Sequence, residues 1–432
     1  MDVPNNIPIA RLGEPFYIGS VQRLYAIPGA DSHMVTETTS AGSVFDVGSI
    51  FEVPGSDVAR AVFRHALYSK MGDPAFWSEV SEPIKTKKTL SPSLRAELTN
   101  GLLAHLCDQG ARTHHGGMID AESGDVVTSG MPTHPSRFNV VERFEIRKPS
   151  KADVLGSWLF DYSDFPGRDG FVVPLEYIVR FGITGASSVF KKYQSLGATE
   201  QKVFEAELGV SKPLEAWQLL DRPISDCTTK FEPEDRSVSK QEALSLCGLS
   251  GQQFAKSMEL AVLGASAVRY LLAEMGLLLW DIKWEFAKSG DDLVFVDTID
   301  TDSLRATRSF EEDDQTLVVH FNKQAIRDYY RIIHGDWLEA VNLAKKLAPA
   351  KGVPFTEILS GGQASGEYPP TPSISEEFLT IQTRKMTAIE SFMTGTLSAA
   401  ETATELEKSG RQEIAFYSEA GKLDAFVELN RI

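Results

Sequence analysis

Residues 280–305 carry charged side chains that could hold a metal ion and a phosphorylated ligand. Asp281, Lys283 and Glu285 alternate with apolar side chains, and Asp297 follows after a Ser-Gly-Asp-Asp turn. Mg²⁺ prefers oxygen ligands and keeps several waters, so one or two carboxylates are enough when substrate phosphates complete its shell. A lysine among these acids would then contact a phosphate. The alternative interpretation is a hairpin whose outer face is simply charged.

The alternation on both sides of the turn predicts a β-hairpin. Successive side chains of a strand point to opposite faces, so the charged residues share one face and the aromatic residues pack on the other. The patterns elsewhere predict β-rich segments at 15–54 and 137–185, helices at 56–71, 92–108, 239–276 and 322–348, a loop at 360–372, and two polar helices at 374–394 and 397–421.

The composition bounds the class of protein. The 432-residue chain has a net charge of -17, with 42% hydrophobic and 24% charged residues. These values are typical of a globular protein, and the length predicts roughly two to three domains. An acidic chain disfavours nucleic acid as a partner, because phosphate contacts need clustered Lys and Arg. An anionic small molecule would have to be bound by a local group of cations.

The cysteines indicate a protein of a reducing compartment, and the histidines do not indicate a zinc site. Cys107, Cys227 and Cys247 are too scattered for a disulfide framework, and the pair His114 and His115 lacks metal-ligand spacing and is interpreted as structural. No run reaches the roughly 18 apolar residues of a membrane span, and no signal peptide is evident, so we expect a cytoplasmic protein without membrane contact. The phosphate loop GxxxxGK[ST], the GxGxxG turn and the GxSxG elbow are absent. Any use of ATP therefore requires another architecture.

Six segments occur in an order that points to a known family: "GSVQRLY", "SVFDV", "PLEYIVRFGITGAS", "TTKFEPEDRSVS", "GLLLWDIKWEF" and "VDTIDTDSLR". Together they resemble SAICAR synthetase, the phosphoribosylaminoimidazole-succinocarboxamide synthase of purine biosynthesis, over about residues 15–394. The resemblance implies a two-lobed α+β fold. An N-terminal antiparallel sheet lobe (1–115) would cover the nucleotide, a larger α/β lobe (116–394) would hold the substrates and metal, and 395–432 would be a helical extension.

The resemblance also implies an activity and its residues. Family members use Mg-ATP to join a ribotide carboxylate to the amine of aspartate through an acyl phosphate, releasing ADP and phosphate. By position, the implied catalytic residues are Lys283, Asp297 and Arg305; the ATP-binding residues are Gly19, Ser20, Arg23, Glu285 and Asp297; the metal ligands are Glu285 and Asp297; and the substrate-binding residues are Asp46, Arg180, Ser187, Lys230, Glu232, Asp302 and Arg305.

Two of these residues suit phosphate chemistry on physical grounds. The guanidinium groups of Arg180 and Arg305 present forks of donors that match phosphate oxygens. The residues alone leave other roles open: both arginines could form salt bridges within the fold, Asp281 could stabilise the hairpin, and Asp46 could stabilise its own turn.

The sequence also departs from the family pattern. Ser20 and Ser56 stand where the family has lysines, Gln22 occupies a nearby basic position, and Arg23 is the expected replacement for the lysine over the nucleotide phosphates. Thr298 replaces an acid, and residues 151–170 look inserted. Three functions remain open: a SAICAR synthetase, a related ligase acting on another carboxylate or amine in a specialised pathway such as that of a nucleoside-like natural product, and a nucleotide-binding homologue with weak catalysis. The oligomeric state, including a homo-oligomer, is also open.

Overall fold

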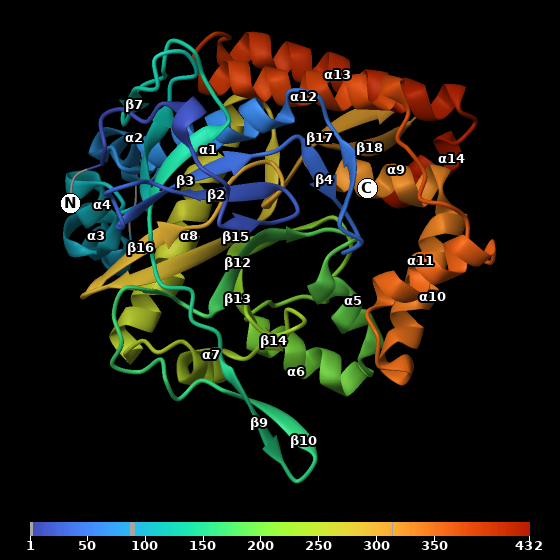
Figure 1. The fold of residues 1–432 in the computed structure, drawn as a ribbon, viewed down its shortest axis with the longest axis horizontal. Coiled ribbons are helices and arrows are strands. Elements are labelled where there is room, and N and C mark those ends of the chain that lie inside the picture. Colours follow the sequence, from blue (N-terminus) through green and yellow to red (C-terminus); the bar gives the residue numbers. More distant parts are fainter. Residues whose placement is uncertain (1–2, 87–90, 313) are drawn as a thin grey trace.

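The N-terminal part of the chain is built on a six-stranded antiparallel sheet (Figure 1). The computed structural model describes residues 3–86, 91–312 and 314–432. The strand order is β1-β2-β3-β8-β6-β7, and the strands are β1 (Tyr17–Ile18), β2 (Gln22–Ala26), β3 (His33–Thr38), β6 (His115–Ile119), β7 (Val126–Val127) and β8 (Phe138–Glu142). Three strands of this sheet, β6, β7 and β8, lie at or beyond residue 115, the expected end of the N-terminal lobe.

Helix α1 (Ser56–Met71) packs against β3, β6 and β8 of this sheet and confirms the helix predicted at 56–71. It is followed by α2 (Pro74–Lys85), and a small hairpin of β4 (Ala41–Ser43) and β5 (Ser49–Glu52) precedes it. The helix predicted at 92–108 is two helices, α3 (Pro92–Asn100) and α4 (Leu102–Gln109). The extended backbone of Gly101 separates them.

The second sheet has the acidic hairpin at its centre. Strands run in the order β14-β13-β12-β15-β17-β18, with β11 and β16 also paired to β15. The bounds are β11 (Phe171–Val172), β12 (Leu175–Ile183), β13 (Gln218–Thr229), β14 (Ser237–Val238), β15 (Leu278–Ser289), β16 (Asp292–Val296), β17 (Leu304–Glu312) and β18 (Gln315–His320). The predicted hairpin is confirmed as β15 and β16, with Glu285 opposite Val296.

The apolar face of β15 is sealed by helix α8 (Gly251–Glu274). Ile282, Trp284 and Phe286 are completely buried in the main core, as the alternation predicts. The predicted helical region 239–276 is broken into α7 (Lys240–Leu246) and α8 at Gly248, which has a φ of +70° and would place a Cβ 2.7 Å from Phe165. Helices α5 (Ser188–Ser195) and α6 (Ala198–Leu208) were not predicted.

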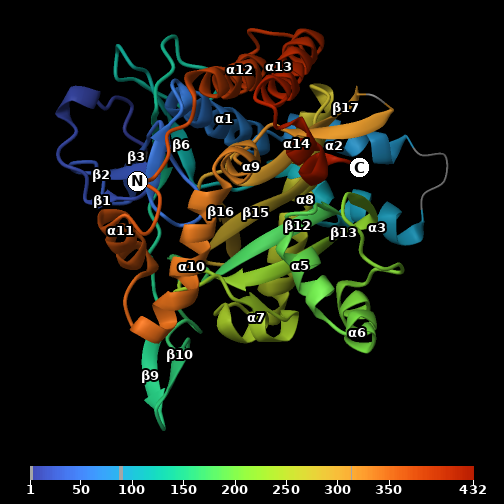
Figure 2. The same ribbon diagram turned by 90° about the vertical axis from the view of Figure 1, so that its right-hand side faces the viewer.

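Six helices complete the chain: α9 (Gln324–Ile333), α10 (Gly335–Lys351), α11 (Phe355–Ser365), α12 (Glu376–Met393), α13 (Ala399–Glu419) and α14 (Leu423–Asn430). The helix expected over 322–348 is therefore two helices, and the expected loop at 360–372 is helical as far as Ser365. Figure 2 shows α12 and α13 side by side across the top of the molecule, and α12 also packs on α1. The extension packs on the second sheet, since α13 contacts α12, β17 and β18, and α14 contacts α9 and β18.

The segment that looked inserted forms a separate arm. Strands β9 (Ser150–Val154) and β10 (Ser157–Asp161) pair only with each other and project away from the body in both views (Figures 1 and 2). None of the helices in the described ranges is long and apolar enough to cross a membrane.

Candidate active site

Two lysines lie among three carboxylates at the charged face of the acidic hairpin. Lys283 Nζ lies 2.5 Å from Glu176 Oε1 and 2.9 Å from Glu285 Oε1. It is also 3.7 Å from Asp297 Oδ2. Lys230 Nζ lies 2.5 Å from Glu285 Oε2. Four residues singled out in the sequence (Lys230, Lys283, Glu285 and Asp297) therefore form one cluster.

The carboxyl groups of Glu285 and Asp297 lie close enough to shift each other's pKa, and the charges of Lys230 and Lys283 act on both. Burial and the neighbouring Asp297 charge raise the pKa of Glu285 to about 7. Burial also raises the pKa of Asp297, but Lys230 and Lys283 outweigh it and hold that pKa well below its usual range. The charge of Asp297 helps to raise the pKa of Glu285, so the two carboxylates repel each other. A cation bound between them would relieve this repulsion.

These two acids fit a Mg²⁺ ion that is shared with substrate phosphates. The side chain of Asp297 is one-third exposed, so its carboxylate oxygens are accessible beside the buried Glu285. Within the described ranges, no group of three or more His, Cys, Asp and Glu side chains could hold a metal ion. Mg²⁺ needs only one or two carboxylates when phosphates supply further oxygens, so such an ion would be bound together with a nucleotide.

The backbone at Asp297 adopts a conformation that is uncommon outside glycine. Its φ is +69°, in the left-handed region, directly after the last residue of β16. Tyr68 of α1 donates its hydroxyl to the carbonyl oxygens of Val296 at 3.0 Å and Asp297 at 2.9 Å. The backbone amide of His114, a residue interpreted as structural, donates to the carbonyl oxygen of Phe295 in β16 at 2.9 Å. Both lobes therefore position this carboxylate.

Glu176 belongs to the cluster and was missed from the sequence. It lies on β12, where Tyr177 pairs with Trp284 of β15, and its other oxygen accepts a hydrogen bond from Thr228 Oγ1 at 3.0 Å. The signal was available, since the period of two that puts Glu176 on the same face as Arg180 is visible in "LEYIVR". No pattern in the sequence could point to Tyr68.

The two predicted arginines lie at the other end of the same strand face. Arg305 Nη1 contacts Asp281 Oδ2 at 2.7 Å. Arg180 is buried and binds both oxygens of Asp226, at 2.9 and 3.1 Å, with Asp281 3.7 Å away. Arg180 is thus engaged within the sheet, whereas Arg305 retains more exposure.

Further cations surround Arg305 and were not singled out. Burial lowers the pKa of Lys191, and so do the charges of Arg331, Arg305 and Arg327. The helix-spaced positions 323, 327 and 331 put three basic side chains on one face of α9 or at its start, a spacing readable in the sequence. Among the described atoms, the buried Ser187 Oγ has no hydrogen-bond partner at the start of α5. A group of basic side chains therefore surrounds Arg305, at the other end of the strand face from the acidic cluster.

The remaining predicted residues have other partners. Asp46, four-fifths exposed, contacts Lys345 Nζ at 2.5 Å, although its charge also acts on Arg327. Glu232 accepts hydrogen bonds from Tyr162 and from Arg236, at 2.9 and 3.0 Å, rather than facing the lysine cluster.

The glycine hairpin of the N-terminal sheet carries the other predicted ATP-binding residues. Gly19 and Ser20 form the turn between β1 and β2, where the Gly19 amide donates to the Gln22 carbonyl. Arg23 is half-exposed, and it pairs with the buried Glu37 of β3. Its Nη1 lies 3.6 Å from Glu37 Oε2. Strand alternation puts Arg23 and Gln22 on opposite faces of the sheet.

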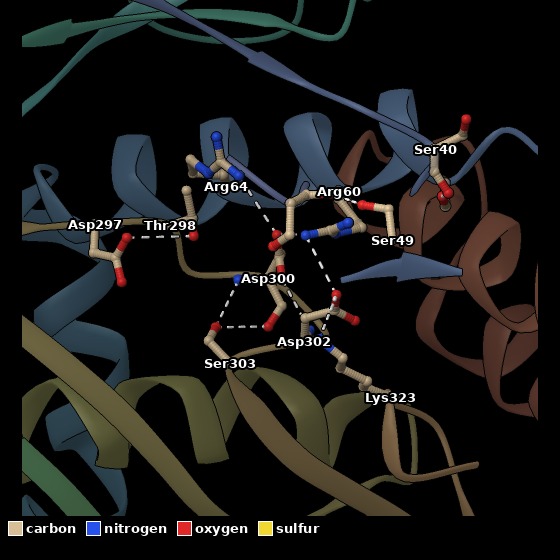
Figure 3. Close-up of polar contacts among 12 residues, drawn as sticks. Ser40, Ser49, Arg60, Arg64, Asp297, Thr298, Asp300, Asp302, Ser303 and Lys323 are labelled. Atoms are coloured by element: carbon tan, nitrogen blue, oxygen red, sulfur yellow. Dashed lines mark hydrogen bonds and ion pairs between the residues drawn. The ribbon is translucent and has the colours of Figure 1, made fainter. Parts of the chain in front are cut away.

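An ion-pair network joins α1 to the loop after β16 (Figure 3). Arg60 contacts Asp300 Oδ2 at 3.1 Å and Asp302 Oδ2 at 3.4 Å. Lys323 lies 4.0 Å from the same Asp302 oxygen. Asp302, predicted to be near the substrate, therefore lies between the lobes and among cations.

Comparisons with known proteins match this chain to one family. The SAICAR synthetase family model matches residues 161–343. The putative phosphoribosylaminoimidazole-succinocarboxamide synthase of Archaeoglobus fulgidus is 30% identical over 246 residues, which are 56% of this chain and 70% of that protein. The phosphoribosylaminoimidazole-succinocarboxamide synthase of Thermoplasma volcanium is 30% identical over 168 residues, 39% of this chain and 55% of that protein. The SAICAR synthase structure from Saccharomyces cerevisiae, complexed with SAICAR, has 17% identity and a TM-score of 0.46, covering 91% of this chain and 98% of that one.

Fold and site together define a two-lobed α+β protein with an acidic and a basic region along one central strand. The chain covers more than two thirds of the Archaeoglobus protein at 30% identity, and this similarity identifies the family. The chain belongs to the SAICAR synthetase family and is a divergent member of it. It spans about half the length of the next Thermoplasma relatives that it matches.

Proposed function

We propose that this protein is an ATP-dependent ligase that joins a carboxylate on a phosphorylated heteroaromatic substrate to an amine. The observation that carries the proposal is the cluster of Lys230, Lys283, Glu285 and Asp297 on β15 and the loop beside it. Two lysines and a pair of acids can bind a nucleotide phosphate chain and Mg²⁺ together. Membership in a family of carbon-nitrogen ligases supports this assignment.

The distance between the two charged regions along β15 fits an elongated substrate. Asp281, which contacts Arg305, and Glu285 are four residues apart on one face, or about 13 Å of extended strand. A substrate phosphate held by Arg305, Lys191 and Ser187 would leave the rest of the molecule directed along β15 toward Lys283. The reacting carboxylate would then lie beside the nucleotide.

The chemistry follows from the weakness of a carboxylate as an electrophile. A carboxylate oxygen attacks the γ-phosphorus and ADP leaves, giving an acyl phosphate. The amine then forms the C–N bond at the acyl carbon, and inorganic phosphate leaves with the former carboxylate oxygen. Lys283 and Lys230 would bind and orient the phosphoryl oxygens. Mg²⁺, held by Glu285 and Asp297, would supply neutralisation of phosphate charge when bound.

The substrates are proposed by class. The family supports a ribotide carboxylate with aspartate as the amine, as in SAICAR formation in purine biosynthesis in the cytoplasm. The absence of lysine at Ser20 and Ser56 favours a changed partner pair, as in a specialised pathway. A homologue that binds nucleotide without turnover is the alternative.

A direct assay separates these functions. The protein is incubated with Mg-ATP, aspartate and the aminoimidazole carboxylate ribotide, and ADP and amide are quantified by mass spectrometry, followed by a panel of other amines and heteroaromatic carboxylates. ADP and amide in equal amounts are expected with at least one pair. Efficient turnover of the purine pair, together with rescue of a purine-requiring strain, would contradict a specialised role. ATP binding without ADP formation from any pair would contradict ligase activity.

A further inference from the structure

Helix α1 places two arginines in the interior between the lobes. Arg60 and Arg64 are both at least nineteen-twentieths buried, and both use one oxygen of Asp300, at 3.1 and 3.4 Å. Figure 3 shows the two guanidinium groups above the loop that carries Asp300 and Asp302. Arg60 also pairs with Asp302, so Arg64 has the weaker share of the negative charge.

The hydrogen-bonding groups of Arg64 are incompletely satisfied. Its Nη2 makes the single 3.4 Å contact with Asp300, and in the described part of the chain its buried Nε has no partner. With its amide oxygen turned toward α1, Gln22 accepts from Arg64 Nη1 and Nη2 at 3.2 and 3.1 Å. A buried cation with a neutral amide as a main partner leaves positive potential that is not cancelled locally.

That potential lies between the glycine hairpin and the acidic cluster. Gln22 is the first residue of β2, beside the turn at Gly19 and Ser20. On the other side, the charges of Arg64 and Asp297 are close enough to affect each other. Arg23, the cation that β2 itself provides, is on the opposite face of the sheet beside Glu37.

We propose that Arg64 is a positioning residue for the nucleotide phosphates, acting through Gln22. Its guanidinium holds the Gln22 amide oxygen inward, which turns the amide NH₂ outward toward the phosphates, and adds a fixed positive charge behind that donor. Burial on a helix keeps this charge in place without an exposed lysine in the hairpin. The inference rests on the proposed function, because Arg64 can act on nucleotide phosphates only if the protein binds a nucleotide between this face of β2 and the acidic cluster.

The test is calorimetric titration of the full chain with Mg-ATP, Mg-ADP and adenosine. Arg64→Gln is expected to weaken Mg-ATP binding about tenfold, which corresponds to about 1.4 kcal/mol, Mg-ADP less, and adenosine not at all. The double variant Arg64→Gln with Gln22→Lys is expected to regain most of the ATP affinity, because it returns a cation to the same place. Thermal unfolding of each variant reports folding separately.

A second variant keeps the test valid if Arg64→Gln does not fold. Gln22→Leu leaves the arginine in place and removes the amide, so it should also weaken ATP selectively. Arg411→Gln on α13 controls for the change in net charge, and Arg23→Gln tests the rival cation of the hairpin. Unchanged ATP affinity in Gln22→Leu, equal losses for adenosine and ATP, or a selective loss at Arg23 instead would overturn the inference. If the wild-type protein binds no Mg-ATP, the proposed function itself fails, and this inference with it.

Discussion

Asp297 combines a left-handed backbone with a carboxylate directed at two lysines. Asn tolerates the same φ of +69° better than most residues, so Asp297→Asn removes the charge while keeping the backbone. We expect the variant to remain folded and its turnover to fall about a hundredfold or more, since metal-linked charge stabilisation is worth several kcal/mol. Steady-state kinetics across Mg²⁺ concentrations measure this. Wild-type turnover with the same Mg²⁺ dependence would remove Asp297 from the site.

Glu285 gives the site a defined pH dependence. Its pKa is raised from 4.5 to about 7 by burial and by Asp297, so the folded state binds this proton more tightly than the unfolded state. The stabilisation from this group is therefore complete below pH 4.5 and is lost as the pH rises through 7. Urea denaturation from pH 5 to 8 should show a decline in the free energy of unfolding that Glu285→Gln flattens. Parallel profiles for both proteins would contradict the raised pKa.

Arg305 and Arg180 are expected to behave differently when each is replaced by Ala. Arg305→Ala should weaken binding of a phosphorylated substrate by about 1.5–3 kcal/mol and of its dephosphorylated analogue much less. Arg180→Ala should instead lower stability, because it leaves the partly buried Asp226 without its bidentate partner. Equal losses for both compounds in Arg305→Ala would mean that this side chain does not hold the phosphate.

At this scale the sequence predicts residues that share one strand and misses those that come from elsewhere. Lys283 and Glu285 follow from alternation along β15, and Glu176 could have followed from the same rule on β12. Tyr68 and Arg64 could not, because their contacts depend on where α1 packs, which local periodicity does not contain.

Among the elements, α13 is fixed to α12 by a buried ion pair. Lys385 Nζ contacts Glu413 Oε2 at 2.5 Å, and Gln382 donates to the same oxygen at 2.7 Å. Removing one partner leaves an unpaired buried charge, so Glu413→Leu should cost about 3–5 kcal/mol of unfolding free energy. The double variant with Lys385→Met should recover most of it. Chemical denaturation measures both, and a loss in the double variant equal to that in Glu413→Leu would contradict an ion-pair origin.

Element prediction was accurate where periodicity was strong and failed at breaks. Helix α1 has the predicted bounds and the hairpin β15–β16 lies where alternation placed it, because apolar spacing is regular there. Gly101 and Gly248 divide helices that the periodicity joined, and their role depends on tertiary contacts such as that with Phe165. Helix α14 was missed, and it packs on α9 and β18, which supply much of its stability.

At the scale of the whole molecule, the two lobes bring opposite charges to one strand. The chain carries a net charge of -17, yet cations gather around Arg305 and between the lobes. The resemblance of ordered segments predicted the α+β fold, and the sequence pattern predicted the helices near 374–394 and 397–421. The resemblance did not predict that the N-terminal sheet continues to Glu142, because β8 returns from a distant part of the chain to pair with β3.

The proposed ligase activates a carboxylate by phosphoryl transfer in this site. The most direct measurement uses a substrate whose carboxylate is labelled with ¹⁸O, incubated with Mg-ATP and the amine, with mass analysis of the inorganic phosphate released. An acyl phosphate transfers one carboxylate oxygen to phosphorus, so phosphate carrying one ¹⁸O in step with amide formation is predicted. Amide formation with unlabelled phosphate would contradict this account.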